Sequence, residues 1–180
     1  MTQNASLPAC WTGKIEDMDD APLLETVKML ADRSRMQGLR VAVAESCTGG
    51  WLAKCCTDLP GSSDWFECGW TVYSDAAKTQ LLDVDLGLIR REGAVSRVVV
   101  EAMAAGVLER AQCDLACAIS GVAGPSGGTE HAPVGCVWFA FLRSDGKVHS
   151  ERRDFSGNRD RVRRESVLHA LRRLAEEISL

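Results

Sequence analysis

The fold of this chain is decided by residues 39–50, Leu-Arg-Val-Ala-Val-Ala followed at once by Glu-Ser-Cys-Thr-Gly-Gly. The apolar run at 39–44 predicts a buried strand, and we expect a helix over Trp51–Thr57 directly after the glycines. Backbone N–H groups at a helix N-terminus lack partners, so they can hold a phosphate or the oxyanion of an acyl transfer. The alternative is an ordinary capped turn between a strand and a helix, with Ser46 or Thr48 as the cap. The spacing alone leaves both alternatives open.

Apolar strands and helices alternate along the rest of the chain. This alternation predicts the α/β class, as a three-layer α/β/α domain with a mixed, mostly parallel sheet and helices on both faces. A chain of 180 residues has room for one domain. We expect that domain at 21–180, behind an acidic, flexible N-terminal extension at 1–20. The remaining elements are expected as helices from Pro22 to just before Gly38, from Ser74 to Leu82, over Leu86–Arg91, from Ser96 to about Ala111 and over Arg159–Ile178, and as strands over Gly69–Tyr73, Leu115–Ile119, Val134–Leu142 and Val148–Phe155, with an Asp145-Gly146 hairpin turn.

The composition is typical of a soluble globular protein, with 46% hydrophobic and 26% charged residues. No uninterrupted apolar run reaches the roughly 20 residues that a membrane helix needs, so we expect no membrane partner. The net charge of -4 argues against nucleic-acid binding, which usually requires a strongly basic face. Residues 1–8 carry neither a positive charge nor an apolar stretch, so we expect no secretory signal and a cytoplasmic location.

The eight cysteines form no C-x-x-C pair, and the three histidines stand apart from them in the sequence. Zinc sites usually show paired ligands at short spacing, so we expect no metal site. Without a secretory signal the compartment is expected to be reducing, which leaves the thiols free. Most of these cysteines are then expected to be small buried hydrophobic residues.

Three polar segments follow predicted strands, at Glu45–Gly50, Tyr73–Lys78 and Ser120–Gly128. Ligands of open α/β sheets bind beyond the carboxyl ends of the strands, so the segments form one site if their strands are parallel neighbours. The glycine-rich third segment can cradle a sugar-phosphate or serve as a flexible connection, and His131 beside it is expected to be a surface residue. Arg159, at the start of the last helix, can reach an anionic ligand or lie on a solvated, ion-paired face.

Lys78 occupies a position suited to a catalytic base. It lies in the first turn of the helix predicted after Tyr73, where the helix dipole disfavours a positive charge. A neutral lysine can activate a serine nucleophile, provided that burial or a neighbouring charge lowers its pKa from about 10.4. The alternative is a solvent-exposed lysine beside a half-buried tyrosine.

Five blocks stand in one order along the chain, and it is their combination that is specific. They are residues 44–50 (Ala-Glu-Ser-Cys-Thr-Gly-Gly), 73–78 (Tyr-Ser-Asp-Ala-Ala-Lys), 93–96 (Gly-Ala-Val-Ser), 120–128 (Ser-Gly-Val-Ala-Gly-Pro-Ser-Gly-Gly) and 133–135 (Pro-Val-Gly). Over about residues 23–178 the chain resembles the CinA C-terminal domain family, and within it the stand-alone nicotinamide-nucleotide amidases.

The resemblance implies an α/β/α domain that often dimerises, and therefore a homo-oligomer whose other partner is a small-molecule nucleotide substrate. It implies hydrolysis of the carboxamide of nicotinamide mononucleotide to nicotinic acid mononucleotide and ammonia, without a cofactor, in pyridine-nucleotide recycling. Ser46 is then the nucleophile, Lys78 its base and Tyr73 an assisting group, with backbone N–H groups near Thr48–Gly50 stabilising the oxyanion. The residues implied to hold substrate are Glu45, Thr48, Gly49, Gly50, Ser120, Gly121, Gly124, Pro125, Gly127, Gly128 and Arg159.

Cys47 is intrinsically an easier nucleophile than Ser46, but the direction of its side chain argues against it. Successive residues leaving a strand point to opposite sides, so only one of the two can face a site shared with Tyr73 and Lys78. We expect Cys47 to point toward the protein body, where a thiol behaves as a small hydrophobic group.

Two positions depart from the pattern of the family. Asp75 stands where asparagine is common, and its charge can support a protonated Lys78. Ala132 stands where a lysine is frequent, so a phosphate contact made there in relatives must come from another cation. Two alternatives to the amidase stay open: a nucleotide-binding or regulatory module without turnover, and an amidase for a different small amide.

Overall fold

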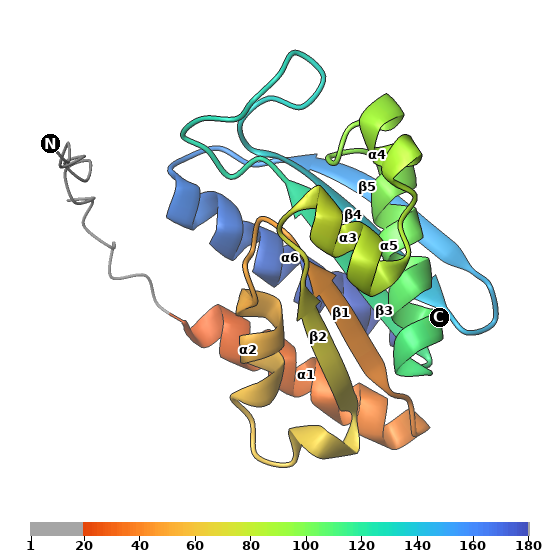
Figure 1. The fold of residues 1–180 in the computed structure, drawn as a ribbon. Coiled ribbons are helices and arrows are strands. Elements are labelled where there is room, and N and C mark those ends of the chain that lie inside the picture. Colours follow the sequence, from red (N-terminus) through yellow and green to blue (C-terminus); the bar gives the residue numbers. More distant parts are fainter. Residues whose placement is uncertain (1–19, 180) are drawn as a thin grey trace, which may run out of the picture.

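The computed structural model describes residues 20–179 of the chain (Figure 1). The acidic extension predicted for residues 1–20 therefore lies outside the described residues, apart from Asp20. The helices are α1 (Ala21–Gln37), α2 (Trp51–Thr57), α3 (Asp75–Leu82), α4 (Leu86–Glu92), α5 (Arg97–Ala111) and α6 (Arg159–Ser179), with a 3₁₀ turn η1 (Ser62–Asp64). The strands are β1 (Val41–Glu45), β2 (Phe66–Thr71), β3 (Leu115–Gly121), β4 (Cys136–Arg143) and β5 (Val148–Asp154).

The sheet is mixed, with the strand order β2-β1-β3-β4-β5. Strand β1 pairs in parallel with β2 and with β3, whereas β4 is antiparallel to both of its neighbours, β3 and β5. Among the described strands, β4 therefore runs alone against the common direction, and the β4–β5 hairpin closes the sheet. This arrangement confirms the predicted mixed sheet with one antiparallel hairpin.

Helices cover both faces of the sheet, which gives the predicted three layers (Figure 1). Val41 and Val43 of β1 pack in the core shared with α1, α2 and α6. Ala42 and Ala44, which alternate with them, pack in the core shared with α3, α4 and α5. Because the strand is buried on both faces, its sequence is a continuous apolar run instead of a polar–apolar alternation.

Most predicted boundaries hold within one or two residues, and the largest difference is at the start of the edge strand β2. The strand expected at Gly69–Tyr73 runs from Phe66 to Thr71 instead, so Tyr73 lies beyond its end. Strand β3 continues to Gly121 because that residue pairs with Val137 of β4. Two of the residues assigned to the glycine-rich loop are thus part of the sheet.

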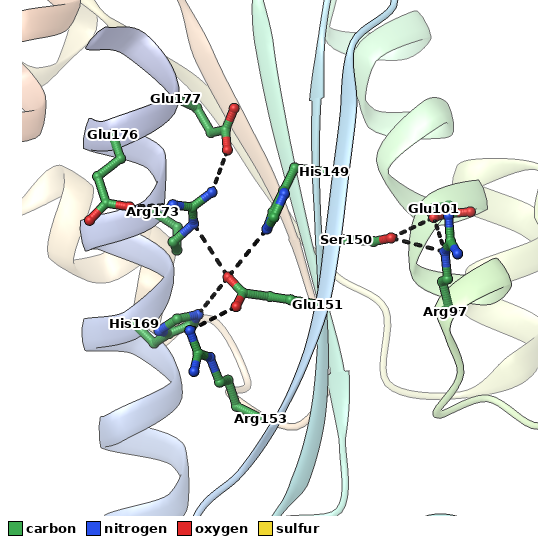
Figure 2. Close-up of polar contacts among 10 residues, drawn as sticks. All are labelled: Arg97, Glu101, His149, Ser150, Glu151, Arg153, His169, Arg173, Glu176 and Glu177. Atoms are coloured by element: carbon green, nitrogen blue, oxygen red, sulfur yellow. Dashed lines mark hydrogen bonds and ion pairs between the residues drawn. The ribbon is translucent and has the colours of Figure 1, made fainter. Parts of the chain in front are cut away.

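Strand β5 ties the sheet to helices on both sides through polar contacts (Figure 2). Toward α6, the Glu151 carboxylate lies 3.0 Å from His169 Nε2 and 3.3 Å from Arg173 Nε. Toward α5, Ser150 Oγ donates to Glu101 at 2.6 Å. These contacts fix the position of α6, whose first turns reach the carboxyl ends of the parallel strands.

The described cysteines follow the prediction. All seven of them are free, and six are buried, with Cys68 half-buried. None of the helices within residues 20–179 combines the length and the apolar character needed to cross a membrane.

Candidate active site

The three polar segments converge at one edge of the sheet, as expected for neighbouring parallel strands. A cavity of about 260 Å³ opens there between the ends of β1, β2 and β3. Its walls combine residues from all three segments with the start of α6 and the 93–96 block. The lining residues are Ser46, Cys47, Tyr73, Asp75, Lys78, Ala94, Val95, Ser120, Gly121, Val122, Ala123, Gly124, Ser126, Gly127 and Arg159.

Helix α3 delivers Lys78 to the base of this cavity. Ser74 caps the helix by accepting a hydrogen bond from the Ala77 N–H at 3.1 Å, which fixes the first turn. The Lys78 side chain is only 1% exposed. Its Nζ lies 3.4 Å from Ser46 Oγ and donates to two carbonyl oxygens, of Val72 at 3.1 Å and of Tyr73 at 3.4 Å.

This arrangement suits a neutral amine. A neutral lysine has two N–H donors and one lone pair, so the two carbonyls can take both protons while the lone pair faces Ser46. Burial lowers the pKa of Lys78 below its usual value, because the charged form loses its hydration. The negative charge of Asp75 opposes this effect and raises the pKa.

The turn between β1 and α2 places Ser46, and the N–H groups of Ser46, Gly49 and Gly50 already have acceptors within the protein. The Ser46 N–H donates to Ile119 O at 3.0 Å, and the Gly49 N–H donates back to Ser46 O at 3.2 Å. The buried Glu45 carboxylate accepts from the N–H groups of Gly50, Leu52 and Ala53 at distances of 3.1, 3.0 and 2.8 Å, and so occupies the start of α2.

The expectation that backbone N–H groups near Thr48–Gly50 hold the oxyanion stays a prediction, and two of these N–H groups are already used. Gly49 and Gly50 already have acceptors for their N–H groups, and Thr48 is fully buried. None of the three lines the cavity, nor does Glu45. The physical reason is that an internal carboxylate fills the anion position that a helix N-terminus offers. Contact between substrate and Glu45, Thr48, Gly49 or Gly50 stays a prediction that this geometry does not support.

The glycine-rich loop offers further free donors. No hydrogen bond among the described residues uses the N–H groups of Ala123, Gly124, Ser126 or Gly127, and all four line the cavity. Gly124 has a φ of 80°, and a Cβ there would lie 2.6 Å from Val134 Cγ1. Only glycine fits this position, which lets the loop turn its backbone toward the cavity.

Tyr73 and Arg159 meet at the mouth of the cavity. The Tyr73 side chain is 62% exposed, and Arg159 Nη2 donates to its hydroxyl at 3.4 Å. Arg159 Nη1 donates to Gly124 O at 2.9 Å, which joins α6 to the glycine-rich loop. Within residues 20–179 no hydrogen bond links the phenol to Ser46 or Lys78, so Tyr73 reaches Lys78 through its carbonyl oxygen.

The other predicted residues of the third segment divide between cavity and surface. Ser120 is buried and donates from Oγ to Ala94 O at 2.7 Å, which attaches the 93–96 block to the site. Gly121 lies in the cavity wall, whereas Pro125 and Gly128 do not. Contacts of Pro125 and Gly128 with substrate stay predictions.

Cys47 lies in the wall of the cavity but is 5% exposed and belongs to the core under α1, α2 and α6. Burial raises the pKa of its thiol to about 12. The thiolate is therefore scarce near neutral pH, and within residues 20–179 no hydrogen bond links the thiol to a base, whereas Ser46 Oγ lies 3.4 Å from Lys78 Nζ. This difference favours Ser46 as the nucleophile of the pair.

Comparison with known proteins places the chain in a family. Residues 24–178 match the family model of the CinA C-terminal domain. The chain belongs to the CinA C-terminal domain family. The predicted family membership is thus confirmed for nearly the whole described chain.

Two relatives of this CinA domain are similar over nearly their full lengths. Nicotinamide-nucleotide amidohydrolase PncC of Escherichia coli strain K12 is 46% identical over 160 residues, which cover 89% of this chain and 97% of that protein. The protein of the same name from Pseudomonas putida is 47% identical over 151 residues, covering 83% and 93%.

Solved structures of CinA proteins share the fold. The crystal structure of the CinA superfamily protein from Klebsiella pneumoniae 700603 has a TM-score of 0.84 at 34% identity, over 87% of this chain and 98% of that one. The structure of the competence/damage inducible protein CihA from Agrobacterium tumefaciens has a TM-score of 0.86 at 33% identity, over 91% and 99%.

The sequence analysis of this CinA domain missed Arg163. This residue follows Arg159 by one helical turn on α6, and its Nη2 donates to Thr48 O at 2.8 Å. The i, i+4 spacing of two arginines on a predicted helix was a usable signal, because such residues share one face. The spacing could not predict which residues this face of the helix contacts, because that depends on how α6 packs beside α2.

Proposed function

We propose that this chain is a nicotinamide-nucleotide amidohydrolase, which converts nicotinamide mononucleotide to nicotinic acid mononucleotide and ammonia. The observation that carries the proposal is the 3.4 Å approach of Lys78 Nζ to Ser46 Oγ in a cavity at the ends of three parallel strands. The names of the Escherichia coli and Pseudomonas putida relatives point to the same reaction.

The nucleophile in this proposal is Ser46, with Lys78 as its base. The neutral amine takes the hydroxyl proton while Ser46 Oγ attacks the carboxamide carbon. The tetrahedral intermediate collapses as Lys78 returns that proton to the departing nitrogen, so ammonia leaves and an acyl ester remains on Ser46. Lys78 then takes a proton from water, which attacks the ester, and gives that proton to Ser46 Oγ as the acid leaves, so that the serine hydroxyl and the neutral amine are restored.

Two further parts of the cavity have roles in this reaction. The N–H groups of Ala123, Gly124, Ser126 and Gly127, and that of Cys47 beside the nucleophile, form no hydrogen bond among the described residues and are donors available to the oxyanion. Arg159 is the cation that lines the cavity at the start of α6, and we assign it to the phosphate of the nucleotide. A cytoplasmic location and a homo-oligomeric state stay predictions.

The test is ammonia release from nicotinamide mononucleotide by the purified protein, with Ser46→Ala as the matched control. We expect release from the mononucleotide, much less from the riboside, and none above background from Ser46→Ala. Equal release from wild type and Ser46→Ala would overturn the proposal. Release from a different small amide, but not from the mononucleotide, would keep the chemistry and change the substrate.

One observation favours a second candidate, a nucleotide-binding module without turnover. The charge of Asp75 raises the pKa of Lys78, and a protonated Lys78 is no base. This candidate predicts that the mononucleotide binds in calorimetry while no ammonia is released at any pH from neutral to alkaline.

A further inference from the structure

The Ser46–Lys78 approach depends on the position of one short turn. A nitrogen–oxygen distance of 3.4 Å is at the long end of hydrogen bonding, so a small shift of the turn breaks the contact. From the side of β1, Glu45 holds this turn through the Gly50 N–H. On the opposite side the turn meets α6.

Arg163 of α6 contacts the turn from that side. Its Nη2 donates to Thr48 O at 2.8 Å and lies 3.4 Å from the place where a Cβ on Gly49 would stand. The guanidinium carbon also lies 5.5 Å from the centre of the Trp51 ring, the first residue of α2. Among the described residues, Arg163 and Lys78 are the only side chains from outside β1 that hydrogen-bond residues 46–50.

The contact of Arg163 with the turn is separate from substrate binding. Arg159 lines the cavity, whereas Arg163 does not. Arg163 instead contacts the turn itself, at Thr48 O. The Nε of Arg163 is buried without a hydrogen-bond partner within residues 20–179. Burying an unpaired donor lowers stability, so the position of Arg163 is unfavourable for folding alone.

We propose that Arg163 is a positioning residue, which holds the Ser46 turn against Glu45 so that Ser46 Oγ stays within reach of Lys78. The inference rests on the proposed role of Ser46 as nucleophile. Two arginines one turn apart on α6 then have different roles. Arg159 contacts the substrate, and Arg163 orients the nucleophile without touching the substrate.

The test compares Arg163→Met and Arg163→Lys with Arg172→Ala, which removes an exposed arginine from the same helix. We expect kcat to fall about 10–100-fold in both Arg163 variants, as for a small misplacement of a reacting group. KM should change less than about twofold, because uniform binding of the substrate is untouched. Lysine should not rescue, since an ammonium cannot reproduce the planar stack on Trp51. Arg172→Ala should match wild type.

Each variant is assayed below its own melting temperature, so that a loss of folding is not read as a loss of positioning. A folded Arg163→Met with wild-type kcat overturns the inference. So does full rescue by Arg163→Lys, which would mean that only charge matters. A rise in KM at constant kcat overturns it as well, because that pattern belongs to a substrate contact.

Labelling with a fluorophosphonate separates this inference from the proposed substrate. The reagent forms an ester at an activated serine oxygen and releases fluoride, whatever the natural substrate. A wild type that labels at Ser46 but spares the mononucleotide, with slower labelling of Arg163→Met, keeps the inference and overturns the substrate. A wild type that neither labels at Ser46 nor hydrolyses the mononucleotide overturns both.

Discussion

Lys78 Nζ stands 3.4 Å from Ser46 Oγ, although the two residues are 32 positions apart in the sequence. Ser46 leaves the end of β1, and Lys78 rises from the first turn of α3, which follows β2. The parallel pairing of β1 with β2 brings both to the same edge of the sheet. The carbonyl oxygens of Val72 and Tyr73 then direct the amine toward the hydroxyl.

The first prediction separates two adjacent candidates for the nucleophile. Ser46→Ala should lower kcat by several orders of magnitude, as nucleophile removal does in serine hydrolases. Cys47→Ala should stay active and lose about 1 kcal/mol of stability, since a small buried side chain is removed. Steady-state rates and urea unfolding measure the two effects. An inactive but folded Cys47→Ala beside an active Ser46→Ala would show that the nucleophile is Cys47.

The second prediction concerns the pH dependence that Asp75 imposes on Lys78. Activity should rise with pH along an acidic limb, because only neutral Lys78 is a base. Asp75 raises the pKa of Lys78, so Asp75→Asn should lower that pKa and move the limb of kcat/KM to lower pH. At pH values below the wild-type limb, the variant should therefore be faster than wild type.

Asp83→Asn is the matched control for this profile. Asp83 is an exposed residue that pairs with Arg110, outside the cavity. Its replacement should leave the limb in place. If the limb of Asp75→Asn coincides with that of wild type, the limb reports a group other than Lys78.

The third prediction is that Glu45 stabilises the structure around the site by capping the start of α2. Glu45→Gln replaces an acceptor oxygen by an NH₂ group that faces backbone N–H donors of α2, which should cost about 1–3 kcal/mol of unfolding free energy. Glu67→Gln removes an exposed partner of Arg40 and should cost about 1 kcal/mol or less. Urea unfolding measures both. Equal midpoints for Glu45→Gln and wild type would refute the internal cap.

The fourth prediction concerns the phosphate. Arg159→Ala should raise KM for the mononucleotide more than it lowers kcat, because a phosphate contact binds ground state and transition state alike. The weak reaction of the riboside, which has no phosphate, should be unchanged. Initial-rate kinetics on the two substrates provide the comparison. A variant that loses both activities in equal proportion would place Arg159 in the chemistry instead.

Most helices and strands could be predicted from short-range sequence patterns. The apolar runs at β1 and β3, the Ser74 cap and the Asp145-Gly146 turn each depend on neighbours in sequence, and each was predicted close to its observed place. The start of β2 was missed because its pairing with β1 shifts register between Val41 and Ala42, an event that depends on two segments at once.

The sequence predicted which residues form the site better than it predicted the contacts that these residues make. The sequence placed Ser46 after a strand and Lys78 in the first turn of the helix that follows the next strand, and the residue types suggested their chemistry. It could not show that Glu45 folds back onto the start of α2, which removes that helix terminus as an anion site. Nor could it show that Arg163 lies over Trp51, since that contact requires the packing of α6.

The most direct test of the account is to trap the ester on Ser46 with hydroxylamine. At substrate concentrations far below KM, ammonia release reports acylation alone, so hydroxylamine should leave its rate unchanged. Part of the product should then become the hydroxamate instead of the acid, and Ser46→Ala should form neither. A rate of ammonia release that rises with hydroxylamine, or turnover without any hydroxamate, would contradict an acyl-enzyme on Ser46.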